Sequence, residues 1–173
     1  MVVGSLVAIA FGTVFVLVNS ADLATPWPLA IRVTGLVVAA LLVAGLVIVA
    51  RSTEASSPVD GPDDRHRRFW LVVLLEAAAL FGGLAVINGV LDRPSVAVAW
   101  IAVVVGVHFF ALAAIWRMPM YRWLGAAMTV LGLAGFLIDA LGGDRAVVEL
   151  VAGVGSGAAL YAAVGFAVQE ALR

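Results

Sequence analysis

The chain has 173 residues, of which 64% are hydrophobic and 12% charged, and its formal net charge is −1. With a mean hydropathy of +1.15, these values exclude a soluble globular domain, because so few polar side chains cannot cover its surface. The balanced charge, without a basic stripe, argues against nucleic acid as a partner. Cysteine is absent, which excludes disulfides, thiolate metal ligands and cysteine nucleophiles. We therefore predict an all-α integral membrane protein.

Long apolar runs predict six transmembrane helices in a single membrane domain of residues 1–173. Each run approaches or exceeds the roughly 20 residues that cross a hydrocarbon core. The runs lack the period of 2 that a membrane-spanning strand would show, which favours helices over a barrel. The first run has no Lys or Arg before it, so we expect a retained helix rather than a secretory signal. The predicted spans are residues 2–18, 29–50, 69–91, 95–116, 121–140 and 146–168.

The basic residues indicate the orientation and the membrane. All ten are arginines, which together with the high content of Ala, Val and Gly favours a bacterial inner membrane. Residues 51–68 are the only long hydrophilic segment, and we predict a flexible cytoplasmic loop there. By the positive-inside rule both termini are cytoplasmic. That side carries Arg51, Arg65, Arg67, Arg68, Arg117, Arg122 and Arg173, and the other side carries Arg32, Arg93 and Arg145.

The first three spans resemble the last three in sequence. The segments 11–18 and 105–112 align without a gap, which pairs Gly12 with Gly106 and Phe15 with Phe109. Three spans are an odd number, so the second copy must enter the membrane from the opposite side, and we predict two inverted three-helix repeats. The alternative is chance recurrence in a biased sequence. Beyond a shortened loop the aligned pairs are Arg32 and Arg122, Gly35 and Gly125, Gly45 and Gly135, and more weakly Glu76 and Glu149, Gly82 and Gly155.

Glu76 and His108 are the two titratable side chains deepest in the predicted spans. Counted at ~1.5 Å per residue from Arg68 and Arg117, both lie about 12 to 14 Å inside the membrane. An ionised carboxylate at this depth costs several kcal/mol unless it is paired or protonated. We expect the two to meet across neighbouring antiparallel helices, where they could relay protons, bind a cation or act as acid and base. The plainer alternatives are a helix–helix hydrogen bond from His108 and a protonated Glu76 bonded to a backbone carbonyl.

A second group of polar residues gathers toward the other side of the membrane. A local ion pair at the interface explains it most simply, and an outer gate is the alternative. Taken with Glu76 and His108, the candidate pathway residues are Asn88, Asp139 and Glu149. The whole group is Asn19, Asn88, Asp139, Arg145 and Glu149.

Small residues and tryptophans complete the predicted environment. Gly83 shares a helix face with Glu76, and Gly153 shares one with Glu149, which would leave room beside each carboxyl group. The tryptophans, Trp100 among them, lie near span ends and are expected in the interfacial belt. His or carboxylate pairs at i, i+3 or i+4 do not occur within a span, so we predict neither a metal nor a cofactor.

The leading functional hypothesis is a small multipass transporter or channel for a proton, an ion or a small, partly apolar solute. One alternative is an intramembrane enzyme acting on a lipid or isoprenoid, with Glu76 as general acid and His108 as base or orienting group. Another is a non-catalytic scaffold or accessory subunit that docks through the charged loop. Expected partners are membrane lipids, a small-molecule or lipid ligand in the bundle, and a second copy, because six short helices barely enclose a pathway.

Overall fold

The computed structural model describes residues 2–52 and 63–173, and every regular element in these two ranges is a helix. The all-α prediction is thus confirmed for the described chain. The apolar runs explain it, because a helix satisfies its backbone hydrogen bonds within one segment. The elements are α1 (Val2–Val18), α2 (Trp27–Ser52), α3 (Asp63–Gly89), the 3-10 turn η1 (Pro94–Val96), α4 (Ala97–Trp116), α5 (Pro119–Ala140), α6 (Arg145–Val148), the π-helical segment η2 (Glu149–Val154) and α7 (Gly155–Ala171).

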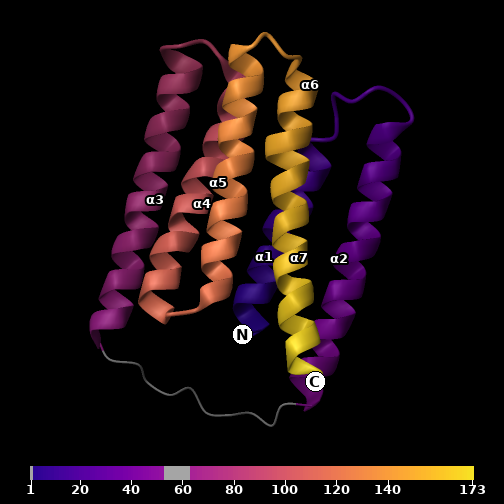
Figure 1. Ribbon diagram of the computed structural model, residues 1–173, viewed down its shortest axis with the longest axis vertical. Coiled ribbons are helices and arrows are strands. Elements are labelled where there is room, and N and C mark those ends of the chain that lie inside the picture. Colours follow the sequence, from indigo (N-terminus) through magenta and orange to yellow (C-terminus); the bar gives the residue numbers. More distant parts are fainter. Residues whose placement is uncertain (1, 53–62) are drawn as a thin grey trace.

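A helix covers each of the six predicted runs, with α6, η2 and α7 forming one continuous helix. Five helices of the described chain are long and apolar enough to cross a membrane, and α1, with 17 residues, is shorter. Successive helices are antiparallel, so the start of α1, the α4–α5 turn and the end of α7 lie at one end of the bundle (Figure 1). This end is called the Arg-rich end, for Arg51, Arg67, Arg68, Arg117, Arg122 and Arg173.

The turns form where proline or a left-handed residue stops the helix. Helix α4 ends at Arg117, whose φ is 54°, and Pro119 then opens α5, where its missing N–H costs nothing. At the opposite end Gly142 has a φ of 78°, and the N–H of Gly143 donates to the Ile138 carbonyl at 2.8 Å. These caps make the tight reversals that keep consecutive helices antiparallel.

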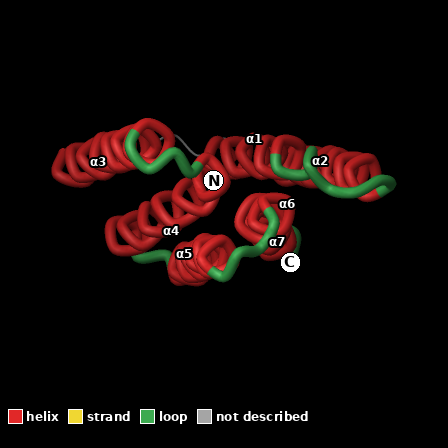
Figure 2. Tube along the Cα trace, turned by 90° about the horizontal axis from the view of Figure 1, so that it is seen from above, coloured by secondary structure: helices red, strands yellow, loops and turns green. Residues whose placement is uncertain are grey.

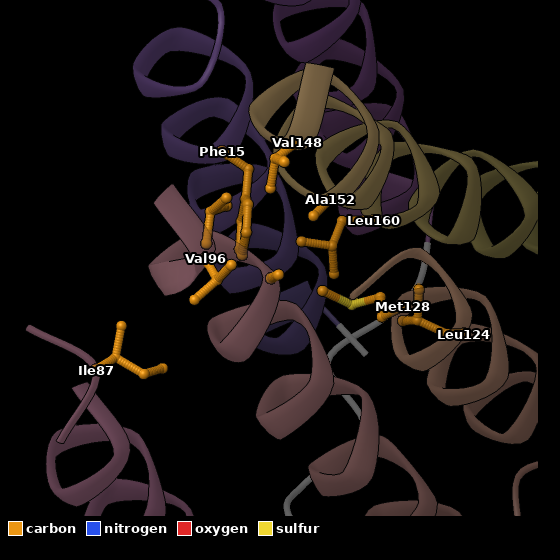
Figure 3. Close-up of a cluster of buried hydrophobic side chains, with 10 residues drawn as sticks. Phe15, Ile87, Val96, Leu124, Met128, Val148, Ala152 and Leu160 are labelled. Carbon is orange, nitrogen blue, oxygen red and sulfur yellow. The ribbon is translucent and has the colours of Figure 1, made fainter. Parts of the chain in front are cut away.

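The helices form two layers. Seen along the bundle, α3, α1 and α2 make one row, and α4, α5 and the α6–α7 helix make the other (Figure 2). Helix α4 packs on α5, α1 packs on both α2 and α7, and α3 packs mainly on α4. The central core lies between α1, α4, α5 and α7, where Phe15, Met128, Val148, Ala152 and Leu160 converge (Figure 3).

Glycines allow two of these interfaces to be unusually close. Between α4 and α5, a Cβ added to Gly106 would lie 2.9 Å from the Gly125 carbonyl, and one added to Gly125 would lie 2.8 Å from the Gly106 carbonyl. Between α1 and α7, a Cβ on Gly157 would lie 2.8 Å from the Gly12 carbonyl. Small residues therefore bring the backbones together, as they do in membrane helix pairs generally.

The boundaries differ from the predicted ones around the hydrophilic segment. Helix α2 continues to Ser52, and α3 begins at Asp63 instead of Phe69, so both ends of the predicted loop 51–68 are helical. Residues 53–62 lie outside the described residues. Arginine is a good helix former, and aspartate is favoured at a helix start, which accounts for the added turns of α3.

Candidate functional site

Helices α3 and α4 meet along one antiparallel seam, and this seam holds the candidate site. Because the two helices are joined by a short turn, residues at equal distances from that turn face each other. Along the seam Phe69 meets Trp116, Glu76 meets His108, and Ala79 meets Trp100. The register therefore places a carboxyl group opposite an imidazole between two apolar helices.

The central contact joins Nδ1 of His108 to Oε2 of Glu76 at 2.8 Å. This is an ion-pair distance, although Nδ1 has no hydrogen bond of regular geometry with the described residues. The side chains retain 13% exposure for His108 and 22% for Glu76, so both are largely enclosed. The contact expected from residue counting is present. The pair could exchange a proton between carboxyl and imidazole, or could open to admit a cation.

An aromatic cluster separates this pair from the Arg-rich end. Phe69 stacks on Trp116 with ring centroids 5.8 Å apart, and Tyr121 lies 5.8 Å from both Trp116 and Phe109. Phe109 is in turn 5.9 Å from the His108 ring, edge to face. Sequence reasoning missed this cluster because it placed the tryptophans at span ends and did not consider which phenylalanine or tyrosine each would meet. The signal was the equal spacing of Phe69 and Trp116 from the α3–α4 turn.

Farther along the seam, toward the α3–α4 turn, Trp100 corrects one prediction. The Trp100 indole donates from Nε1 to the Ala79 carbonyl at 3.2 Å and occupies the place where a Gly83 side chain would be. Trp100 therefore packs between the two helices, and the room expected above Gly83 is filled. The same holds for Gly153, where the side chain of Asn19 fills the space.

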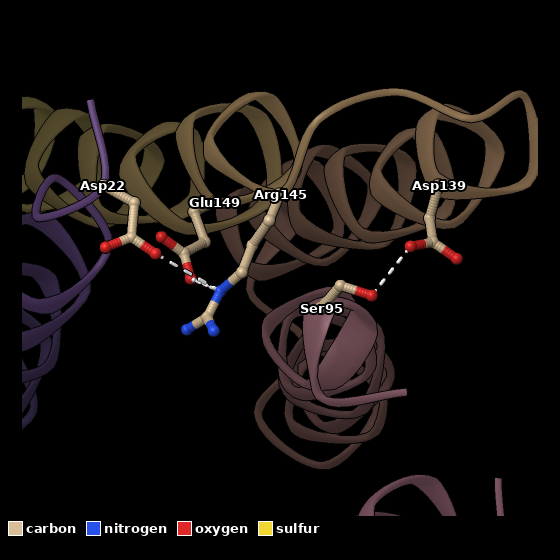
Figure 4. A network of polar contacts seen from close by, with 5 residues as sticks. All are labelled: Asp22, Ser95, Asp139, Arg145 and Glu149. Atoms are coloured by element: carbon tan, nitrogen blue, oxygen red, sulfur yellow. Dashed lines mark hydrogen bonds and ion pairs between the residues drawn. The ribbon is translucent and has the colours of Figure 1, made fainter. Parts of the chain in front are cut away.

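The second polar group divides into two separate clusters at the opposite end (Figure 4). In one, Arg145 Nε lies 2.6 Å from Glu149 Oε1 and 3.4 Å from Asp22 Oδ2. The Glu149 side chain is 10% exposed, compared with 57% for Arg145 and 50% for Asp22. The predicted local ion pair thus exists for Glu149. Asp22 was missed because its loop between α1 and α2 gives no sequence signal for where it folds.

In the other cluster, Asp139 pairs with Arg93 and Ser95 rather than with Arg145. Ser95 donates to Asp139 Oδ1 at 2.8 Å, and Arg93 lies 3.3 Å from Oδ2. These contacts tie the α5 end to the α3–α4 turn. Since His108 follows Ser95 by 13 residues, or about 20 Å of helix, the cluster is not continuous with the Glu76–His108 pair.

The two predicted asparagines have different surroundings. Asn19 is buried at 9% exposure and donates from Nδ2 to the Phe15 carbonyl at 2.8 Å, which places it in the α1–α7 contact. Asn88 is on an exposed face of α3, so the structure brings it into neither cluster. Its place on the predicted pathway rested on depth alone, and depth does not determine the direction of a side chain.

The π-helical segment η2 is a further feature that sequence reasoning missed. It covers Glu149–Val154, at the start of the most buried long helix of the described chain. π-Helical turns are rare and occur often at functional sites. Here the segment carries the buried Glu149 and the close contact between Gly153 and Asn19.

Within the described residues no three His, Asp or Glu side chains converge as metal ligands. The chemistry that the site offers is therefore that of its own carboxyl and imidazole groups: proton uptake, proton release and attraction of a cation. In comparisons by sequence and by structure, no protein-family model, curated protein or solved structure matches this chain.

Proposed function

We propose that this chain is a six-span protein of the bacterial cytoplasmic membrane that transports a proton, or an ion or small, partly apolar solute coupled to one. The observation that carries the proposal is the 2.8 Å contact between Glu76 and His108 inside the apolar α3–α4 seam. Ionisable side chains in such surroundings are costly and commonly mark proton or ion pathways.

The membrane location is supported by helix length and by charge. Five helices have the length and composition of spans, and the 17 residues of α1 reach the lower limit of about 17 for crossing a bilayer. The arginines concentrate at the end of the bundle that holds the start of α1 and the end of α7 (Figure 1). On the positive-inside rule this end faces the cytoplasm.

Transport needs an element that can move, and α3 is the best candidate. In the described chain it packs mainly on α4, and its exposed side chains include Leu74, Leu75 and Phe81. When Glu76 takes up a proton, its negative charge is lost and the ion pair with His108 ends. The seam is then held by its aromatic and glycine contacts and by the Trp100–Ala79 hydrogen bond. When the proton leaves, the pair forms again, so the protonation state would bias the position of α3.

The aromatic cluster of Phe69, Phe109, Trp116 and Tyr121 would serve as the gate on the Arg-rich side. Its members Phe69, Trp116 and Tyr121 lie nearer to that end of the bundle than the pair does, where we expect them to limit the entry of water. Movement of α3 would separate Phe69 from Trp116, since these two rings belong to different helices. The pair would then be reached from the cytoplasm.

Some of the helix contacts agree with the proposal of two inverted three-helix repeats. Gly35 faces Val16, and Gly125 faces Phe110; under the sequence alignment these are equivalent positions in the two copies. In addition, α1 packs on α7 as α4 packs on α3. Glu149 departs from the pattern, because it pairs with Arg145 near a helix start, whereas Glu76 lies deep in α3. Apart from the way in which the third helices pack, the repeat proposal therefore rests on the first two helices of each copy.

A flux assay in liposomes tests the function. The purified protein is reconstituted with a trapped pH-sensitive dye, and proton flux is followed after a pH step and a membrane potential are imposed. We expect Glu76→Gln to lower the flux at least tenfold, because an amide cannot carry the proton. Glu170→Gln, which changes an exposed carboxyl group near the end of α7, is the matched control and should keep the flux. Wild-type protein without flux under any gradient would count against the proposal, as would an unchanged flux in Glu76→Gln.

A further inference from the structure

A cavity beside the α4–α5 turn combines an apolar wall with two arginines. It is a half-open depression with a volume of about 430 Å³, and it lies at the Arg-rich end, where Arg117 and Arg122 are. Phe110, Ala113, Ala114 and Met118 form its apolar wall, and Arg117 and Arg122 contribute its positive charge. None of these residues belongs to the Glu76–His108 contact, so this is a second site.

The two arginines carry positive charge that the described chain does not neutralise. Within residues 2–52 and 66–173, no carboxylate forms an ion pair with Arg117 or Arg122. The N-terminal end of the α5 helix dipole adds to the positive potential. No side chain of the N-cap residue, Met118, caps the N–H groups of the first turn. The cavity is thus suited to an anion.

The two guanidinium groups favour a phosphate group as the bound anion. The apolar wall favours a phosphate that carries an acyl chain. A guanidinium group can bind phosphate through two parallel N–H bonds. Here Arg117 and Arg122, five residues apart in sequence, both line the same depression. Free phosphate would gain nothing from Phe110 and Ala114. A lipid would use both parts, with its headgroup at the arginines and the upper part of an acyl chain along the wall.

We propose that this cavity binds an anionic phospholipid from the cytoplasmic leaflet, through its phosphate at Arg117 and Arg122. Basic pockets between helices on that side of a membrane are suited to such headgroups. The proposal requires the Arg-rich end to lie at the membrane surface but does not require transport. It would remain valid if the chain proved to be an enzyme or a scaffold.

Lipid titration followed by native mass spectrometry tests the site. The full chain in detergent is titrated with phosphatidylglycerol and, separately, with phosphatidylcholine. We expect preferential binding of phosphatidylglycerol, weakened at least tenfold in the double variant Arg117→Gln/Arg122→Gln. The control, Arg51→Gln/Arg173→Gln, removes the same charge from the same end and should change the affinity less than twofold. Equal weakening in both double variants would overturn the site, because it would show a general charge effect.

Three further measurements keep the test decisive. Ala114→Phe fills the cavity without changing charge, and we expect it to weaken phosphatidylglycerol binding as well; full binding in this variant would contradict the apolar wall. Inorganic phosphate at the same concentrations should not compete. If phosphate alone competes as well as the lipid does, the site is one for free phosphate and the lipid proposal is wrong. Arg117→Lys/Arg122→Lys keeps the charge, so it should fold like the wild type yet bind more weakly through loss of the guanidinium fork.

Discussion

At the residue scale, the Glu76–His108 contact has consequences for stability as well as for function. Each side chain is largely enclosed between apolar helices and each is the other's ion-pair partner. Removing one partner leaves a partly buried polar group without compensation, and this usually costs more than the pair itself contributes. The contact can therefore be measured by the coupling between two substitutions.

A double-mutant cycle should show this coupling. We expect His108→Ala and Glu76→Gln each to lower the free energy of unfolding, and the double variant to lose about 0.5 to 3 kcal/mol less than the two losses added. Thermal unfolding in detergent, with lipid and pH held constant, gives the three differences. His108→Ala combined with Glu170→Gln is the control cycle, and these two distant changes should simply add. Additivity of His108→Ala with Glu76→Gln would show that the 2.8 Å contact carries no energy.

Two adjacent glycines of α3 provide a matched pair for the seam. A side chain at Gly83 would overlap the Trp100 indole, whereas one at Gly82 would meet nothing within 4 Å. We expect Gly83→Ala to destabilise the protein by about 1 to 3 kcal/mol through overpacking, and Gly82→Ala to be neutral or to stabilise it by up to about 1 kcal/mol through helix propensity. Unfolding free energies distinguish the two variants. If both substitutions have the same effect, the indole does not pack on Gly83.

Residue counting predicted the Glu76–His108 contact because two antiparallel helices joined by a short turn place equal counts at equal depth. The same counting could not give the surroundings of Trp100 and Asn88. Trp100 packs against α3, and Asn88 is exposed. Whether a side chain faces a neighbouring helix depends on which face of its own helix packs against that neighbour. A helix that is hydrophobic on every face gives no sequence signal for its packing face.

At the element scale, α3 and α7 differ most in how much of each helix is buried. In the spanning stretch of α3 6% of the residues are buried, compared with 50% for the helix that contains α7. Helix α3 packs mainly on α4, so it is the helix that we propose to move. Helix α7 is held by glycine contacts to α1 and by the Thr13–Tyr161 hydrogen bond of 2.8 Å. The best-packed part of the described chain is the core between α1, α4, α5 and α7.

Cross-linking tests whether α3 moves during transport. The chain has no cysteine, so the double variant Phe69→Cys/Trp116→Cys joins α3 to α4 specifically when a short bifunctional reagent is added. We expect the cross-link to lower the flux at least tenfold relative to the same variant before treatment. The control variant, Phe109→Cys/Tyr121→Cys, joins α4 to α5 at the same 5.8 Å ring separation and should keep its flux. Equal flux before and after linking α3 would rule out its movement.

At the scale of the whole molecule, the sequence predicted the number of helices and their antiparallel order, because apolar length and turn residues are local properties. The packing of the layers was not predictable, since it depends on which apolar faces meet. Contacts such as Gly12 with Gly157 and Gly106 with Gly125 join faces that look alike in sequence. Asp22 illustrates the same limit, because its partner Arg145 is distant in the chain and the two meet only after α1 and α7 have packed.

The last prediction concerns the orientation of the bundle in the membrane. Because the chain has no cysteine, a maleimide will label only the cysteine that is introduced. Single cysteines are introduced in place of Met118, Ala171 and Gly142, and intact cells are treated with a membrane-impermeant maleimide. We expect Gly142→Cys to be labelled from outside, because its turn lies at the end opposite to the arginines (Figure 1). Met118→Cys and Ala171→Cys should be labelled only after the cells are opened, since in the orientation that we propose the Arg-rich end faces the cytoplasm. Labelling of Gly142→Cys and Ala171→Cys from the same side would require an even number of crossings between them. The α6–α7 helix provides one crossing, so that result would remove the helix from the membrane and with it the six-span arrangement on which the Glu76–His108 pathway depends.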